Sequence, residues 1–239
     1  MDYGQNRVAI TTPKRALLAE IERMNAGLGL RNAIQLPGYL RSEVVLGQQN
    51  EITFRTGTNE PNNGGAGIFA TENRLDINDA FFVTHYGLFF YKYTTAGGNA
   101  ARSRARLHSF PNATVFGANA PELEGAYNGK LSLRVDDTVF IDSMDVRRFY
   151  NARTAQQGVA VSTAASNNAY TADDWSGAEM FANETDPLVR LNGPGKNVIR
   201  VALPDTMNFG LVPTETLVAV CYLRGWLSQN GGGFRATGR

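Results

Sequence analysis

The sequence of 239 residues has very few of the side chains on which metal centres and covalent catalysis depend. It contains one cysteine, Cys221, and two histidines, His85 and His108, which form neither an HxH nor an HExxH pair. A single cysteine excludes an internal disulfide, and two separated histidines do not supply the ligand cluster of a metal site. We therefore predict no metal, no cofactor and no catalytic residues in this chain.

Motifs of nucleophilic and phosphate chemistry are also missing. There is no GxSxG elbow, and Gly193–Lys196 (GPGK) lacks the spacing and the Ser/Thr of a phosphate loop, so a plain turn is expected there. We expect His85, at a strand end, to have a structural hydrogen-bonding role. Cys221 lies mid-strand among apolar neighbours, which predicts a small core side chain, because a reactive thiolate needs exposure and a cationic neighbour.

Long apolar runs are absent as well. No run approaches the ~20 residues needed to cross a bilayer. The first residues, MDYGQNRVAITT, contain no apolar stretch of the kind found in a secretory signal. We accordingly expect the protein to be made in a reducing cytosol and to stay there until it is assembled or released.

The chain has little charge of either sign. Lys and Arg number 23 against 22 Asp and Glu, so no general attraction to nucleic acid or to acidic membranes is indicated. Charged residues make up 19%, below the ~25% that is usual for soluble domains. This deficit fits a surface that is partly covered by partners, although a weakly charged monomer has the same composition.

Glycine, by contrast, is abundant, and the pattern along most of the chain has a period of two. Twenty-five glycines, with many Asn and Thr, are typical of a turn-rich, all-β chain. The strand-like segments Ile52–Phe54, Leu75–Val83, Leu88–Tyr93 and Asn197–Leu203 are joined by turns, with a long loop at Gly57–Gly67. Thr216–Leu227 (TLVAVCYLRGWL) is apolar on both faces, so we expect a strand buried inside a sandwich or against a neighbouring subunit.

One helix is expected near the N-terminus. Thr12 suits the N-cap, Pro13 the first helical position and Gly27 the stop. Apolar side chains recur between them at intervals of four and three residues: Leu17, Ile21 and Met24. A helix with so narrow an apolar stripe is not stable alone. It must therefore dock either on its own sandwich, which is favoured, or on a neighbouring subunit.

The clearest hairpin pattern is Gly129–Asp142 (GKLSLRVDDTVFID), whose first arm alternates apolar and polar side chains. A two-residue turn at the two aspartates would set Phe140 opposite Leu133. A three-residue connection, Asp136–Thr138, sets Ile141 opposite Leu133 and keeps one face apolar. Because a one-residue slip turns every side chain over, we predict the three-residue loop, with Phe140 facing outward.

Three stretches of the sequence resemble virion proteins of bacterial viruses. The closing segment Val218–Phe234 (VAVCYLRGWLSQNGGGF), with its Gly-Trp pair and Asn-Gly tail, is similar to the last strand of coat proteins from tailless, lipid-containing phages. The strand Val198–Pro204 (VIRVALP) and the hairpin Gly129–Asp142 also look like phage virion sequences. The resemblance implies a jelly-roll β-sandwich, single or double, without catalytic residues.

The function implied by this resemblance is structural. The chain would be a virion structural protein, a self-assembling capsid subunit of a bacteriophage, synthesised in the host cytoplasm and located in the virion. Its partners would be copies of itself, other virion proteins, and either the genome or internal membrane lipid. The main alternative is a soluble β-sandwich module that binds carbohydrate or peptide on exposed Tyr and Trp, and an enzyme that processes glycosides comes third.

Two parts and several contact residues follow from this interpretation. Residues 1–30 would form an arm and helix, and residues 31–239 a sandwich that includes an irregular excursion over residues 151–196. Apolar side chains expected at subunit contacts are Leu17, Ile21, Met24, Phe140, Trp175 and Phe181. The one basic cluster, Arg102, Arg104 and Arg106, is interpreted as a solvated edge, with contact to genome or lipid phosphates as the alternative.

Overall fold

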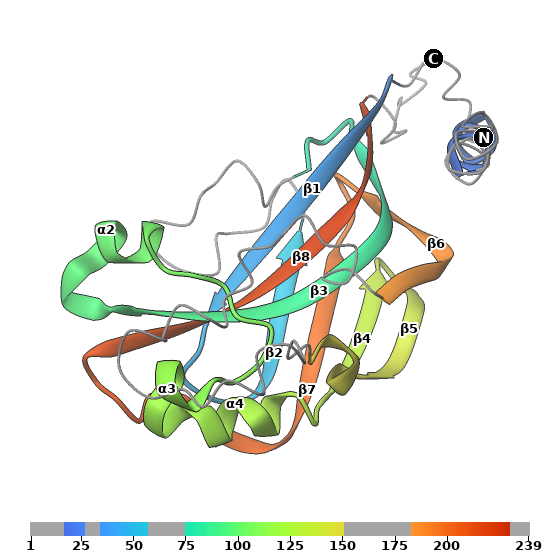
Figure 1. Ribbon diagram of the computed structural model, residues 1–239. Helices are drawn as coiled ribbons and strands as arrows, with labels where there is room; N and C mark the ends of the chain where they lie inside the picture. The colour runs from blue at the N-terminus through green and yellow to red at the C-terminus, as the bar shows by residue number, and fades with distance from the viewer. Residues whose placement is uncertain (1–16, 27–33, 57–74, 151–182, 230–239) are drawn as a thin grey trace, which may run out of the picture.

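The computed structural model describes residues 17–26, 34–56, 75–150 and 183–229, which form two four-stranded antiparallel sheets with few helices (Figure 1). The strands are β1 (Ile34–Val45), β2 (Gln48–Thr56), β3 (Ala80–Thr94), β4 (Lys130–Val135), β5 (Thr138–Asp145), β6 (Asn183–Asn192), β7 (Asn197–Asn208) and β8 (Glu215–Gln229). The helical segments are residues 17–26, η1 (Thr95–Gly97), α2 (Gly98–Ser103), α3 (Ala113–Phe116), η2 (Gly117–Asn119), α4 (Ala120–Ala126) and η3 (Val146–Phe149). The predicted all-β sandwich is thus confirmed.

The front sheet in Figure 1 has the strand order β1-β8-β3-β6, and the back sheet has the order β2-β7-β4-β5. β1 pairs with β8, β2 with β7, β3 with β6 and β4 with β5, always antiparallel. The second half of the chain therefore runs back along the first half in reverse order. Successive strands change sheet at every connection except the β4–β5 hairpin.

The central strand β8 is apolar on both faces, as the sequence predicts. Leu217 and Cys221 belong to the core between the two sheets, whereas Val218 and Val220 belong to a second cluster on the outer face of the front sheet. The back sheet supplies the other side of the main core, from residues such as Phe54. Burying both faces of one strand requires a cover on each side of the front sheet.

A glycine in β8 allows this strand to lie close to β3. A Cβ built on Gly225 would lie 1.9 Å from the backbone oxygen of Phe82. At this point the pairing of β3 with β8 is irregular, with a register shift between Val83 and His85. Gly225 is the first residue of the Gly-Trp pair in the closing strand. At this position there is no space for the Cβ of any other residue.

The turn of the β4–β5 hairpin differs from the prediction. Val135 pairs with Thr138, so the turn has two residues, Asp136 and Asp137, and the predicted three-residue loop is wrong. Asp136 has a φ of 52°, in the left-handed region that aspartate tolerates better than most residues. Val139 consequently pairs with Arg134.

A β-bulge reconciles this short turn with the predicted pairing of Leu133 with Ile141, which is confirmed. The register shifts between Leu133 and Arg134, and Arg134 pairs with Val139, so Phe140 is the additional residue. Phe140 is half-buried and packs against the core, as Ile141 does. The prediction that Phe140 faces outward is therefore wrong.

Two predicted boundaries also need correction. Residues 183–192 form β6, which pairs with β3, although they fall within the predicted irregular excursion. The predicted segments Leu75–Val83 and Leu88–Tyr93 are not separated by a turn, because β3 runs from Ala80 to Thr94 as one strand of 15 residues. The loop over residues 57–67, and Trp175 and Phe181 of the excursion, lie outside the described residues.

The N-terminal helix docks on its own sandwich, as favoured. Ile21 is fully buried in a cluster with Ala80 and Phe82 on the outer face of the front sheet. Leu17 and Met24 are partly buried against the same cluster. Thr12, Pro13 and Gly27 lie outside the described residues.

The hairpin register gives a first test by stability. Leu133 is 5% exposed and faces Ile141, so Leu133→Ala should lower the free energy of unfolding by ~2–5 kcal/mol. Val139 on the same hairpin is 44% exposed, so Val139→Ala should change it by no more than ~0.5 kcal/mol. Urea unfolding of both variants checks the difference, and equal losses would contradict the register.

The contact at Gly225 gives a second test. Gly225→Ala would force a Cβ against the Phe82 backbone and should lower the free energy of unfolding by ~1–3 kcal/mol or more. Gly47→Ala is the matched control, because a Cβ there meets nothing within 4 Å. Thermal unfolding should place the control close to the parent protein. A Gly225→Ala variant as stable as this control would mean that β8 and β3 are not in such close contact.

Candidate functional site

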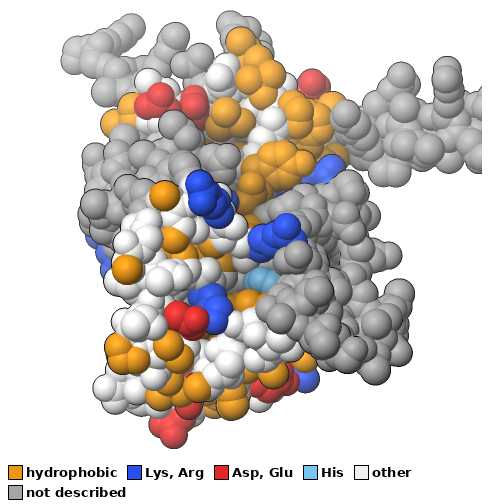
Figure 2. Space-filling view, turned by 60° about the vertical axis from the view of Figure 1, so that its left-hand side comes forward, with side chains coloured by type: hydrophobic (Ala, Val, Ile, Leu, Met, Phe, Trp, Pro, Cys, Tyr) orange, Lys and Arg blue, Asp and Glu red, His pale blue; other side chains and the backbone are white. Residues whose placement is uncertain are grey.

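The outer face of the front sheet, meaning the face turned away from the back sheet, carries the features that most resemble a functional site. One part of it is covered by the helix of residues 17–26. Another part is covered by α2 and the segment after it, since Leu107 and Ala105 pack against Phe89 and Tyr91. Figure 2 views the molecule from the side on which α2 lies in Figure 1, and shows basic side chains gathered near the middle of that side.

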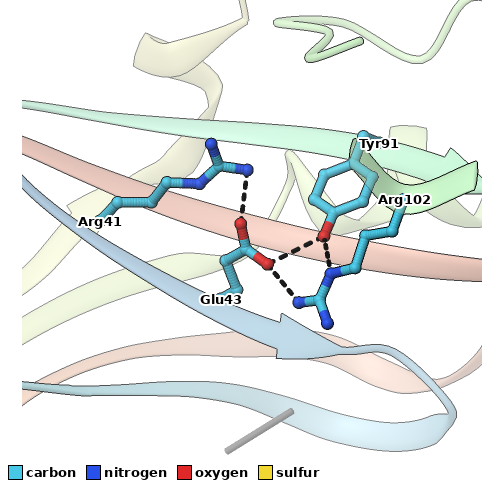
Figure 3. A network of polar contacts seen from close by, with 4 residues as sticks. All are labelled: Arg41, Glu43, Tyr91 and Arg102. Carbon is cyan, nitrogen blue, oxygen red and sulfur yellow. Dashed lines mark hydrogen bonds and ion pairs between the residues drawn. The ribbon is translucent and has the colours of Figure 1, made fainter. Parts of the chain in front are cut away.

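A network of buried polar contacts lies under α2 (Figure 3). Glu43 on β1 is 3% exposed and forms ion pairs with Arg41 on its own strand and with Arg102 on α2. The hydroxyl of Tyr91 on β3 donates to Glu43 Oε2 at 2.8 Å, and Arg102 Nε donates to the same hydroxyl at 2.8 Å. Four side chains from three elements thus meet around one carboxylate.

The electrostatics of this network keep α2 in its position. Burial raises the pKa of Tyr91 well above its ordinary value, and the neighbouring Glu43 carboxylate raises it further. Burial alone would lower the pKa of Arg102, but its hydrogen bonds to Glu43 and Tyr91 outweigh that effect and raise it. Arg102 therefore stays charged and Tyr91 neutral, which is the combination that satisfies a buried carboxylate.

This geometry changes the interpretation of the basic cluster. Arg102 is 5% exposed and engaged with Glu43 and Tyr91, so its guanidinium does not face an outside phosphate. Arg104 and Arg106 are exposed. The structure thus separates the predicted phosphate-contact cluster into one interior arginine and two surface arginines.

Between the two covers the outer face carries tyrosines that reach the surface. Tyr39 on β1 is 52% exposed and meets Tyr222 on β8 edge-to-face, with ring centroids 6.0 Å apart. Three further apolar side chains of β1 are exposed: Ile34, Leu36 and Val45. Exposed apolar side chains concentrated on one strand are a sign of an interaction surface.

Most of the side chains predicted to contact other subunits pack within the chain itself. Ile21 is fully buried against Phe82, and Phe140 is half-buried against the main core. Leu17 and Met24 are partly buried on the same sheet as Ile21. Among the described residues, four of the seven exposed large apolar side chains belong to β1, which the sequence interpretation did not single out: Ile34, Leu36, Tyr39 and Val45.

The histidines and the cysteine have the surroundings of structural residues. The ring of His85 is 3.0 Å from Thr84 Oγ1, and His108 is buried and forms backbone hydrogen bonds with Phe90 of 2.8 and 2.9 Å. Cys221 is 3% exposed in the main core, and burial raises the pKa of its thiol to about 12. A thiol in that state is unreactive, which confirms Cys221 as a core side chain.

The described parts of the chain contain no group of three His, Cys, Asp or Glu side chains that could hold a metal ion. Among the described helices, none combines the length and the apolar content required to cross a membrane.

Sequence reasoning missed Glu43 and Tyr91. A signal for Glu43 does exist, since it is the one acidic residue in β1 and is followed directly by Val44, Val45 and Leu46. A lone carboxylate in an apolar strand predicts a buried partner of opposite charge. The sequence does not identify that partner, because Arg102 lies 59 residues away.

Comparison with known proteins does not extend this picture. No protein-family model matches the chain, and no match is found among curated proteins or among solved structures.

The buried network predicts very different roles for two neighbouring arginines. Arg102→Gln leaves Glu43 without its α2 partner and should lower the free energy of unfolding by ~3–5 kcal/mol. Arg104→Gln, on an exposed side chain, should change it by no more than ~0.5 kcal/mol. Urea unfolding of both variants is the measurement.

A double-mutant cycle separates the ion pair from general damage to the fold. Replacing Glu43 and Arg102 together by Gln removes both charges, so the double variant should lose less than the sum of the two single losses. Strictly additive losses would mean that Glu43 and Arg102 do not depend on one another.

Proposed function

We propose that this chain is a virion structural protein, a self-assembling capsid subunit of a bacteriophage, built on a single jelly-roll sandwich. The order of strand pairing is the observation that carries the proposal. In a jelly roll, eight strands form two packed sheets through two Greek keys. The pairing of β1 with β8, β2 with β7, β3 with β6 and β4 with β5 supports that topology.

Fold alone does not decide function, because jelly rolls also serve lectins and cupins. Three features favour assembly. The chain carries 19% charged residues, which suits a surface that partners cover. Ile34, Leu36 and Val45 expose apolar surface on one strand. The closing strand, whose Gly225 permits close contact with Phe82, also carries the resemblance to phage coat proteins.

The proposed mechanism is multiplication of weak contacts by symmetry. Each subunit contributes modest apolar patches, and a closed shell repeats every contact many times. The protein would be made in the host cytoplasm and would reside in the virion with other virion proteins. Within this proposal Arg104 and Arg106 are the candidates for contact with genome or lipid phosphates, and no residue has a catalytic role.

The second candidate function is a soluble module that binds carbohydrate or peptide. The pair of Tyr39 and Tyr222 favours it, because an exposed tyrosine beside a second ring can act as a stacking platform for a sugar. We rank it second because the exposed apolar surface extends along β1 beyond the two rings.

Electron microscopy and sedimentation of the purified chain test the proposal over a range of salt and protein concentrations. We expect regular shells, rings or sheets, and an assembled fraction that grows with protein concentration. Monomers that stay dispersed under all conditions would overturn the capsid proposal. Binding of polysaccharides by such monomers would then support the binding module.

A further inference from the structure

The four edge strands of the sandwich differ in how regular they are. β1 and β6 border the front sheet, and β2 and β5 border the back sheet. The pairings of β2, β5 and β6 with their neighbours all contain register shifts. β1 pairs with β8 through 12 consecutive residues without a shift.

This regularity matters because an edge strand presents unpaired backbone groups. Bulges distort an edge and are one of the devices by which proteins prevent a second chain from pairing with it. β1 lacks that device and is, at 12 residues, the longest of the four edge strands. Pro37 removes one N–H from the strand, and every other residue of β1 keeps its own.

Within the described sheet, β1 has a hydrogen-bonded neighbour on one side, β8, and borders the sheet on the other. Leaving Tyr39 aside, the described residues of β1 form backbone hydrogen bonds with β8 and with no other described strand. Figure 1 shows β1 at the border of the front sheet, with its first residues running past the end of β2. Ile34, at the start of the strand, is 57% exposed.

The side chains of β1 suit an apolar and uncharged partner strand. Exposed apolar groups occur on both faces of the strand, Leu36 on one and Tyr39 and Val45 on the other. Its two charged residues, Arg41 and Glu43, pair with each other, so the strand has no net charge. An edge guarded by lysines would repel an identical edge, and β1 has no lysine.

We infer that β1 is a site of strand addition and that its occupant is β1 of a second copy of this chain, paired antiparallel about a two-fold axis. Pairing of an edge with its own copy is isologous, so one patch provides both sides of the contact. The two front sheets then continue into one another, and the open backbone groups of both edges are satisfied. This inference rests on the proposed self-assembly and names one of its contacts.

A cysteine scan along the edge tests the inference in the full chain. Cysteine replaces, one at a time, the exposed residues Ile34, Leu36, Pro37, Tyr39 and Val45. The native Cys221 is buried, with its thiol pKa raised to about 12, so it gives little background. Val139→Cys on β5 and Leu211→Cys are matched controls, since both residues are 44% exposed.

Treatment with a short thiol-to-thiol cross-linker should give covalent dimers on a denaturing gel. In a two-fold antiparallel pair, residues near the axis face their own copies and distant residues do not. We therefore expect the dimer yield to peak at one position of β1 and to fall on both sides of it. Both control variants should remain monomeric on the gel.

A charge variant provides an independent measurement. Leu36→Lys places a cation on the exposed edge and should abolish the dimer in solution, while Leu211→Lys should leave it unchanged. Light scattering of both variants measures whether each is a monomer or a dimer in solution.

Failure of the inference and failure of the proposed function give different results. If the unmodified chain assembles while no β1 cysteine cross-links above the controls, the β1 contact is wrong and the capsid proposal stands. If β1 cysteines cross-link but no larger assembly ever forms, the contact stands and the capsid proposal fails. The inference would also be overturned if the purified protein forms no covalent dimers and its β1 edge instead binds an added peptide.

Discussion

The fold depends on the need to bury both faces of the two central strands of the front sheet. β3 and β8 place large apolar side chains on each face, with Phe90 and Cys221 toward the back sheet and Phe89 and Val220 away from it. In most antiparallel sandwiches the outer face is polar and needs no cover. Here the back sheet covers one face, and the other requires additional elements. The helix of residues 17–26 and the α2 segment supply them, so both short elements are structural necessities of the sheet.

The buried network around Glu43 follows from that requirement. The short helix α2 covers β1 and β3 with few apolar contacts. Its buried side chain is Arg102, which forms the ion pair with Glu43. A buried ion pair adds little net stability, because desolvation of both charges offsets their attraction. It does fix position, since Glu43 accepts from groups on α2, β1 and β3 together. The network thus determines where α2 lies, and the apolar side chains beneath it provide most of the free energy.

Local patterns in the sequence predicted much of this architecture. Alternation identified the two-faced β8 and the arms of the β4–β5 hairpin, and the apolar stripe with Ile21 identified a helix that must dock. The hairpin shows where local pattern is insufficient. The aspartate pair permits a tight turn, burial demands that Ile141 face Leu133, and a bulge at Phe140 meets both conditions. Strict alternation of apolar and polar residues does not indicate a bulge, because the additional residue interrupts the period of two.

The remaining errors share a different cause, because they concern partners that are distant in the sequence. Arg102 resembles a surface cation when only Arg104 and Arg106 are considered beside it, and its burial depends on a carboxylate 59 residues away. β6 resembles a loop because its alternating segment is short, and its pairing with β3 decides its conformation. The open edge of β1 is likewise a property of sheet order and cannot be derived from the strand itself.

The covers on the front sheet also explain why much of the exposed apolar surface lies along the edge strand β1. Once the 17–26 helix and α2 occupy the outer face, the apolar side chains that would otherwise form a broad patch are satisfied within the chain. The pairings of the three other described edge strands with their neighbours contain register shifts, which make those edges less regular. Among the described edge strands, β1 alone combines a regular pairing with exposed apolar side chains and no net charge. Under the proposed self-assembly, a sandwich arranged in this way would direct association toward strand pairing, where hydrogen-bond register fixes the geometry between subunits more closely than contact between apolar faces can.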